Sequence, residues 1–318
     1  MLHPAQHIGG QLGAITGPKG TMTASADMED YDSQQFRNGA LVEFLRAVLK
    51  NGVARLGLVI VLALIIASAL APLLAGSSPD VQNLGSRLLP PSLDHWFGTD
   101  NLGRDIFART VYGSRVTLII VLAAALTIAP IGLLVGVASG YFGGITDSLL
   151  MRMTDVFMAF PRLILALAFV AVLGPGIGNA VIAIALTSWP PYARLARSET
   201  LSLRNREFVL AARLQGASHA RILWSYVLPF CIPTSLARLT LDLAGIILIA
   251  AGLGFLGLGV KPPQAEWGSM VAAGRDYIAD QWWLAALPGA AILLASFGFN
   301  LLGDGVRDIL DPKSDVVR

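Results

Sequence analysis

REFVLAARLQGASHARILWSYVLP, residues 206–229, is a polar, arginine-bearing stretch in a chain that is otherwise largely apolar. Residues 207–215 are rich in helix-forming amino acids, and Gly216 suits the left-handed position that ends a helix. Ser218 is a favourable cap for a helix that follows. The stretch therefore predicts a short helix, a sharp turn and a second helix leading back into the apolar part of the chain.

The same stretch has the features of a docking element. Its arginines favour the cytoplasmic side of a membrane. Small residues at Ala211 and Ala212 would allow the groove of a partner protein to close around the short helix. We interpret residues 199–226 as a cytoplasmic loop that couples the chain to a partner; the alternative is an ordinary connecting loop.

Composition places this stretch in a membrane protein. Of the 318 residues, 54% are hydrophobic and 14% are charged, whereas soluble domains average about 25% charged residues. Mean hydropathy is +0.64. The predicted fold class is an all-α polytopic membrane protein.

Apolar runs predict six transmembrane helices, because a helix needs about 20 apolar residues to cross the bilayer core. They cover residues 56–75, 116–139, 155–173, 180–198, 227–260 and 284–303, within a transmembrane domain over residues 56–310. The glycine-rich residues 174–179 separate the third from the fourth, and Trp189-Pro190-Pro191 interrupts the fourth.

The ends of the chain are predicted to be cytoplasmic. Arg46, Lys50 and Arg55 precede the first span, and basic residues near a span favour the inside; an even number of spans then places both termini inside. Residues 1–40 are polar and predict a disordered tail, and residues 311–318 form a second tail. Residues 41–55 predict an interfacial helix, or equally a helical extension of the first span.

Few charges lie within the predicted spans. Arg238 and Asp242 are one helical turn apart, which favours an intramembrane ion pair over a proton relay. Arg162 is expected to extend toward the cytoplasm; the alternative is that it lines a cavity.

Gly132, Gly136 and Gly140 recur at four-residue spacing in the second span, which allows close helix approach. Packing within this chain is favoured over contact with a second membrane subunit.

The sequence lacks the residue patterns that ATP binding, metal binding and catalysis require. None of the four lysines follows a glycine, so no phosphate-binding loop for ATP can form. Cys231 is the only cysteine and the histidines are scattered, so neither a metal site nor a cofactor site in this chain is predicted. Paired nucleophiles and bases are absent from the spans, so the chain is not expected to be an enzyme. A carrier driven by an ion gradient remains an alternative, disfavoured by the lack of paired intramembrane acids.

The docking stretch resembles the EAA loop of ABC importer permeases, in which Glu-Ala-Ala is followed at fixed spacing by Gly and later by Leu-Pro. Here Leu210 takes the acidic position, and Glu207, one turn earlier, could replace it. The residues to which the resemblance assigns ATPase coupling are Glu207, Leu210, Ala211, Ala212, Gly216 and Ala217.

Three further stretches indicate which group of ABC importer permeases the chain resembles. FGTDNLGRDIFARTVYGSRVTL (residues 97–118), FLGLGVKPPQAEWGSM (255–270) and FNLLGDGVRDILDP (299–312) look like the C-type permease of dipeptide and oligopeptide ABC importers. The resemblance covers residue 41 to the end, and it implies the type I ABC importer permease fold in a bacterial cytoplasmic (inner) membrane.

The resemblance also implies the partners. These are a second homologous permease subunit, two ABC ATPase subunits that bind ATP and Mg, and an extracytoplasmic peptide-binding protein, all around the lipid bilayer and without nucleic acid. Permeases for nickel chelates or glutathione look much alike, so they remain alternatives for the substrate.

The outer loops supply the last candidates. Asp100, Arg104 and Asp105 suit a salt-bridged outer cap, and Trp267 is a candidate for packing against a gate or a docked binding protein. Trp282 and Trp283 are expected to anchor the chain at the outer interface.

Overall fold

The computed structural model describes residues 43–76 and 78–310. The predicted tails, residues 1–40 and 311–318, lie outside these residues. Two compact units are distinguished, Met1–Ala47 and Val48–Arg318, and the arrangement below is that of the second unit. Apart from an isolated bridge between Thr99 and Asp105, the described residues form helices, turns and loops, which confirms the all-α fold class.

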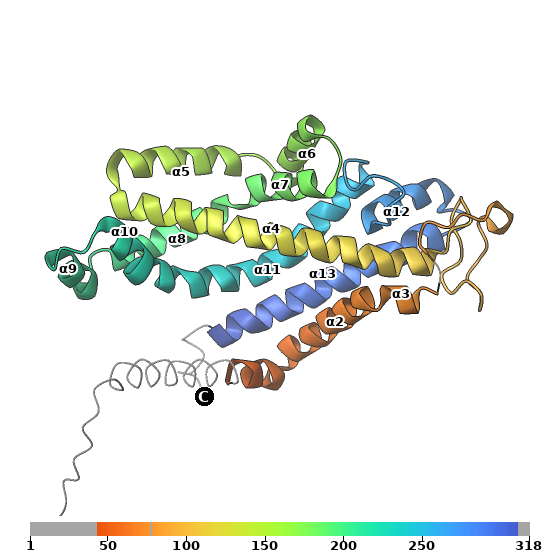
Figure 1. Cartoon of the computed structure of the whole chain (residues 1–318), viewed down its shortest axis with the longest axis horizontal. Coiled ribbons are helices and arrows are strands. Elements are labelled where there is room, and N and C mark those ends of the chain that lie inside the picture. The colour runs from red at the N-terminus through yellow and green to blue at the C-terminus, as the bar shows by residue number, and fades with distance from the viewer. Residues whose placement is uncertain (1–42, 77, 311–318) are drawn as a thin grey trace, which may run out of the picture. The chain divides into compact units, whose positions relative to one another are not determined.

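Four long helices form the body of this unit and lie side by side in Figure 1: α2, α4, α11 and α13. Residues 43–50 are helical, and the helices after them are α2 Gly52–Ala69, α3 Ala71–Leu74, α4 Ile106–Phe142, α5 Gly144–Met158, α6 Arg162–Leu173, α7 Ile177–Ser188, α8 Pro190–Leu203, α9 Glu207–Leu214, α10 His219–Ile222, α11 Leu228–Phe255, α12 Trp267–Gly274 and α13 Trp283–Leu310. Short 3₁₀ turns cover Leu84–Ser86 and Arg275–Tyr277, and a π-helical segment, Leu223–Val227, joins α10 to α11.

By length and composition, four helices of the described chain can cross a membrane, or five if α5 and α6 form one span bent by 94°. Helix α7 is apolar but has only 12 residues, and α8 follows it after Trp189. The predicted count of six therefore depends on whether α7 and α8 act as one span, and it stays a prediction.

Helix ends differ from the predicted spans where local caps intervene. Asn51 caps α2 by accepting hydrogen bonds from the backbone N–H groups of Val53 and Ala54, so α2 begins before residue 56 and inside the predicted 41–55 helix. Asp105 caps α4 in the same way, so α4 begins ten residues before the predicted start and carries Arg109 and Arg115 with it. A turn at Gly257 ends α11 at Phe255 instead of residue 260.

Two further predicted spans contain breaks. Residues 155–158 belong to α5, and the chain turns at residues 159–161 before α6 begins. The 180–198 span is divided at Trp189, because Pro190 starts a new helix at a position where no N–H is needed.

Helices α4 and α8 pack closely through the predicted glycine stripe. A β-carbon built on Gly132 would lie 2.3 Å from Cβ of Tyr192, and one built on Gly136 would lie 2.2 Å from the carbonyl oxygen of Ala193. At Gly140 the nearest atom would be Cβ of Thr200, at 2.8 Å. The stripe therefore serves packing within this chain, as favoured above.

Different helices and loops lie at the two ends of the bundle (Figure 1). Helices α9 and α10 lie at one end, which the arginine distribution predicts to be cytoplasmic. The loop between α3 and α4 lies at the other end, together with α12. We call these the coupling end and the outer cap.

Candidate functional site

A regular turn ends α9 at the coupling end. Gly216 has φ +81°, the left-handed conformation that its lack of a side chain permits. Its N–H donates to the carbonyl of Arg213, and the N–H of Ala217 donates to the carbonyl of Ala212. These two bonds define a Schellman motif, so the sequence expectation of a glycine stop corresponds to a hydrogen-bonded corner with fixed direction.

Helix α9 has a buried face and an exposed face. Val209 and Ala212 are buried, and Val209 belongs to a hydrophobic cluster with residues of α4 and of the start of α11. The exposed face carries large apolar side chains, with Leu214 90% exposed. Of the coupling residues expected from the sequence, Glu207, Leu210, Ala211 and Gly216 are exposed, Ala217 is half-buried and Ala212 is buried.

Side-chain contacts of Tyr141 connect the coupling end to the last turn of α4. The hydroxyl of Tyr141 lies 2.8 Å from Nδ1 of His219, the first residue of α10. The guanidinium of Arg213 lies over the Tyr141 ring, 5.5 Å from its centroid, within the range of a cation–π interaction. Sequence reasoning missed Tyr141, because no local pattern connects residues 141 and 219.

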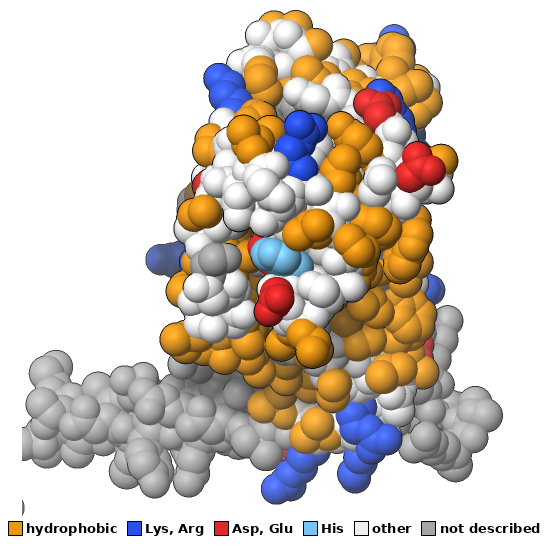
Figure 2. Space-filling model, turned by 90° about the vertical axis from the view of Figure 1, so that its right-hand side faces the viewer, with side chains coloured by type: hydrophobic (Ala, Val, Ile, Leu, Met, Phe, Trp, Pro, Cys, Tyr) orange, Lys and Arg blue, Asp and Glu red, His pale blue; other side chains and the backbone are white. Residues whose placement is uncertain are grey.

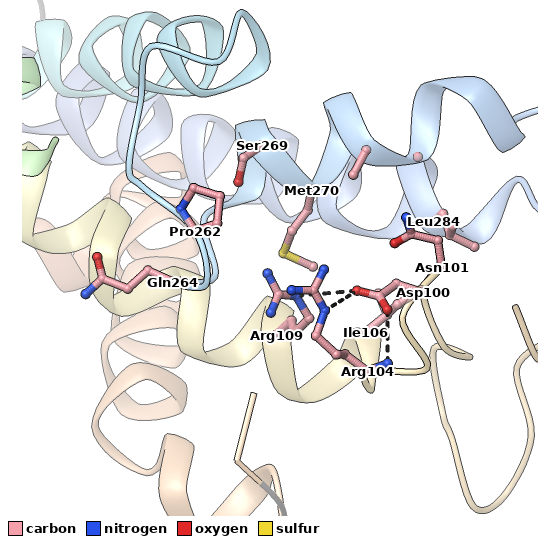
Figure 3. A pocket seen from close by; sticks show the side chains of 12 residues that line it. Asp100, Asn101, Arg104, Ile106, Arg109, Pro262, Gln264, Ser269, Met270 and Leu284 are labelled. Carbon is pink, nitrogen blue, oxygen red and sulfur yellow. Dashed lines mark hydrogen bonds and ion pairs between the residues drawn. The ribbon is translucent and has the colours of Figure 1, made fainter. Parts of the chain in front are cut away.

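The outer cap is built around an ion pair. Oδ2 of Asp100 lies 2.7 Å from Nε of Arg104, and its Oδ1 accepts hydrogen bonds from the N–H groups of Leu102 and Arg104. Figure 3 shows these side chains at the edge of a cavity of about 140 Å³ that is also lined by α12 and by the loop after α11. Charges of both signs are scattered over this end among hydrophobic side chains (Figure 2).

Asp105 does not join the Asp100–Arg104 pair. One of its oxygens caps α4 by accepting from the N–H of Ala108, and the other lies 2.9 Å from Nδ1 of His95. The sequence analysis grouped Asp100, Arg104 and Asp105 in one salt-bridged cap. In the structure Asp100 and Arg104 form an ion pair within the loop, whereas Asp105 caps helix α4.

Arg109 is the residue at this end that the sequence did not single out. Its side chain is buried, and its guanidinium donates to the carbonyl of Pro79 at 2.9 Å and to that of Pro263 at 3.4 Å. It also lies 3.3 Å from Asp80 and 3.9 Å from Asp100. One arginine on α4 thus joins the loop before α4 to the loop after α11.

Trp267 fastens α12 to α4. Its indole Nε1 donates to the carbonyl of Thr110 at 2.8 Å, and its ring covers Gly113, where a β-carbon would lie 2.8 Å away. With 2% exposure the ring lies inside the chain; its contact with a gate or with a docked binding protein stays a prediction.

Glu266 caps α12 from a buried position. Its carboxylate accepts hydrogen bonds from the N–H groups of Gly268 and Ser269, each at 2.8 Å. Burial raises the pKa of Glu266, and these bonds to the charged form oppose the shift. Glu266 belongs to the architecture of the cap, since it is almost fully enclosed.

Trp267→Phe is expected to loosen the outer cap. The variant loses the bond to Thr110, worth about 0.5–1.5 kcal/mol, but keeps most of the ring's packing. We expect a lower midpoint of thermal unfolding in detergent and faster proteolysis of the loop at residues 256–266. Trp282→Phe is the matched control, because Trp282 is 55% exposed; equal effects of the two changes would contradict this role of Trp267.

Inside the predicted fifth span, Arg238 and Asp242 form an ion pair, with Nε of Arg238 3.2 Å from Oδ2 of Asp242. Arg162, at the start of α6, lies 3.8 Å from the other oxygen of Asp242. Arg162 therefore reaches α11 instead of extending toward the cytoplasm, and the expected pair is a cluster of three.

Comparison with protein families identifies two regions. The family described as "Binding-protein-dependent transport system inner membrane component" matches residues 129–316, and "N-terminal TM domain of oligopeptide transport permease C" matches residues 40–91. Together they cover both ends of the bundle and include the coupling helix α9.

Similar proteins carry transport names. The probable D,D-dipeptide transport system permease protein DdpC of Escherichia coli (strain K12) is 45% identical over 80% of this chain and 86% of its own length. The dipeptide transport system permease protein DppC of Alkalihalophilus pseudofirmus is 44% identical over 85% of this chain and 89% of its own length. The nickel transport system permease protein NikC of Escherichia coli (strain K12) is 45% identical over 81% of this chain and 93% of its own length.

These matches confirm the resemblance to C-type permeases that the sequence motifs carry, and they confirm a multi-pass inner-membrane location. The chain belongs to the family of binding-protein-dependent transport system inner membrane components.

Proposed function

We propose that the chain is one of two permease subunits of an ATP-driven importer that moves di- and oligopeptides into the cytoplasm. Family membership and the peptide-transport names of two of its relatives support the peptide substrate. The assembly would contain a second permease, two ATPase subunits and an external binding protein. The substrate is received at the outer cap and released at the coupling end.

The exposed face of α9 is the observation that supports coupling to an ATPase. Leu210 and Leu214 are exposed there, at 41% and 90%, and Phe208, whose ring lies against Phe230 of α11, is 39% exposed. Large apolar side chains grouped on one exposed helix indicate a protein contact. Basic residues at the same end support a cytoplasmic position for the helix, on the side where ATP is found.

In this proposal α9 docks in a surface cleft of one ATPase subunit. Closure of the ATPases around ATP would displace α9, and the Schellman turn would transmit the displacement to α10 and α11. The permease then passes between an outward-open and an inward-open state, each favoured by a different ligand.

Transport by the reconstituted assembly tests the proposal. The chain is placed in vesicles with its second permease, its ATPases and its binding protein, and uptake of alanylalanine is measured with ATP, without ATP and with a proton gradient alone. We expect uptake that depends on ATP and on the binding protein. Uptake driven by the gradient alone would show a carrier, and uptake of nickel chelate without peptide would move this chain to a nickel importer.

We also predict that the chain alone neither binds nor hydrolyses ATP, because no lysine follows a glycine and a phosphate-binding loop cannot form. The measurement is photo-cross-linking of azido-ATP to the purified chain and to the complete assembly. Label should appear on the ATPase subunits only. Saturable labelling of the isolated chain that excess ATP abolishes would contradict the prediction.

A further inference from the structure

A cluster with unequal charges lies halfway along α11. Asp242 is in contact with two arginines, Arg238 at 3.2 Å and Arg162 at 3.8 Å. At 1.5 Å per residue, Asp242 is about 21 Å from the start of α11 and nearly as far from its end. Asp242 therefore lies near the middle of a helix that is long and apolar enough to cross a membrane, and the cluster holds two positive charges and one negative charge.

The arginines of this cluster are not enclosed by the chain. Their side chains are 42% and 37% exposed, for Arg238 and Arg162, whereas Asp242 is 17% exposed. Charged side chains at this depth do not face lipid; they face the interior of an assembly or a water-filled cavity. The exposed side of the cluster is therefore expected to face the interior of the assembly or a water-filled cavity.

The backbone beside the cluster is irregular. Helices α5 and α6 meet at an angle of 94°, and Arg162 is the first residue of α6. Pro161 precedes it, and no side chain caps the helix there. Non-helical backbone at membrane depth is found where it is buried in protein or lines a water-filled cavity, and the positive end of a helix attracts anions.

A buried tyrosine completes the surroundings. Tyr192, at the start of α8, is fully buried; its hydroxyl lies near the charges of the cluster and makes no hydrogen bond to the described residues. Elements α6, α8 and α11 thus converge on one positively charged place.

We propose that this cluster is a binding site for the carboxylate of the transported peptide on its way through the membrane. A guanidinium binds a carboxylate through two parallel hydrogen bonds. Asp242 holds the arginines in place while the pathway is empty, and the incoming carboxylate balances the surplus charge. The inference rests on the proposed function, because it supposes that a peptide passes this surface.

The test compares alanylalanine with its C-terminal amide in vesicles containing the complete assembly. The affinity of the binding protein for each peptide is measured separately, and maximal uptake is determined at saturating concentrations. Arg238→Gln and Arg162→Gln should each lower maximal uptake of the free acid about tenfold and change that of the amide less than twofold. Arg238→Lys should recover part of the loss, since the charge is kept.

Arg194→Gln is the matched control, because it removes a half-exposed arginine that pairs with Asp155 away from the cluster. It should affect both peptides equally and weakly. If the cluster variants lower uptake of both peptides by the same factor, or leave both unchanged, the cluster has no part in carboxylate recognition and the inference is wrong.

A labelling experiment separates this inference from the proposed function. In a Cys231→Ser background, the thiol introduced by Arg238→Cys should react with a water-soluble methanethiosulfonate, and alanylalanine should slow the reaction. A thiol that does not react overturns the inference, whatever the assembly transports. If the wild-type assembly moves neither peptide, the proposed function falls; the site then stands only if acetate slows the labelling, and is wrong if it does not.

Discussion

Gly216→Val is expected to abolish ATP-dependent peptide uptake while the subunit still accumulates in the membrane. The left-handed conformation at Gly216 costs a side-chain-bearing residue roughly 1–2 kcal/mol, and a β-branched residue tolerates it poorly. A β-carbon there would meet no atom within 4 Å, so the effect comes from the backbone alone. Relief of this strain would redirect α9 relative to α10 and displace it from the cleft of its partner.

Gly216→Asn is the matched control, since asparagine adopts the left-handed conformation more readily than other residues. It should keep most of the uptake. Peptide uptake and peptide-stimulated ATPase activity are measured on the same preparation, together with assembly by size-exclusion chromatography. If Gly216→Val kept wild-type values of both activities, the segment that contains α9 would be an ordinary connection without a role in coupling.

Ala211→Trp is expected to change the exposed surface of α9 without lowering the stability of the fold. Ala211 is exposed on α9, so the added ring needs no internal space. Bulk in the proposed cleft should lower uptake in the same way. A normal melting midpoint combined with lost uptake would place the defect at the contact with the ATPase.

Gly136→Val is expected to prevent the bundle from closing. A β-carbon at this position would lie 2.2 Å from the carbonyl oxygen of Ala193 and 2.8 Å from Cβ of Ala196. Backbone atoms of α8 cannot move aside alone, so α4 and α8 must separate along their whole contact. Overpacking of this kind costs about 1–3 kcal/mol or more, and it acts on one of the most extensive helix pairs of the described chain.

The amount of chain in the membrane fraction and its resistance to trypsin measure this effect. Gly178→Val is the matched control, because a β-carbon on Gly178 would meet open space. Gly136→Val should give little folded protein, whereas Gly178→Val should resemble the wild type. Normal abundance and trypsin resistance of Gly136→Val would mean that α4 and α8 do not pack as described.

The sequence predicted helix positions and turns, because these features depend on residues that are close in the chain. Gly216 and Ser218 indicated the corner between α9 and α10, and the structure has both the left-handed glycine and the serine cap there. The apolar runs located α2, α4, α11 and α13, with ends that moved because Asn51 and Asp105 cap helices earlier than hydropathy indicates.

Contacts between distant segments could not be read in this way. Arg109 joins residues 79 and 263, and Arg162 reaches Asp242 across eighty positions. No spacing rule connects such positions, since each depends on how whole helices lie together. For the same reason the sequence did not indicate that the indole of Trp267 is buried and donates to the carbonyl of Thr110.

Helix α4 is far longer than a membrane requires. Its 37 residues extend about 55 Å, against a hydrocarbon core of about 30 Å. Arg109 lies in its first turn and Tyr141 in its last, so one continuous rod is attached to the outer cap and to the coupling end. In the proposed importer, a tilt of α4 would displace both of its ends together. A movement of the ATPase subunits would then change the outer cap, where the binding protein docks, directly and without a series of intermediate contacts.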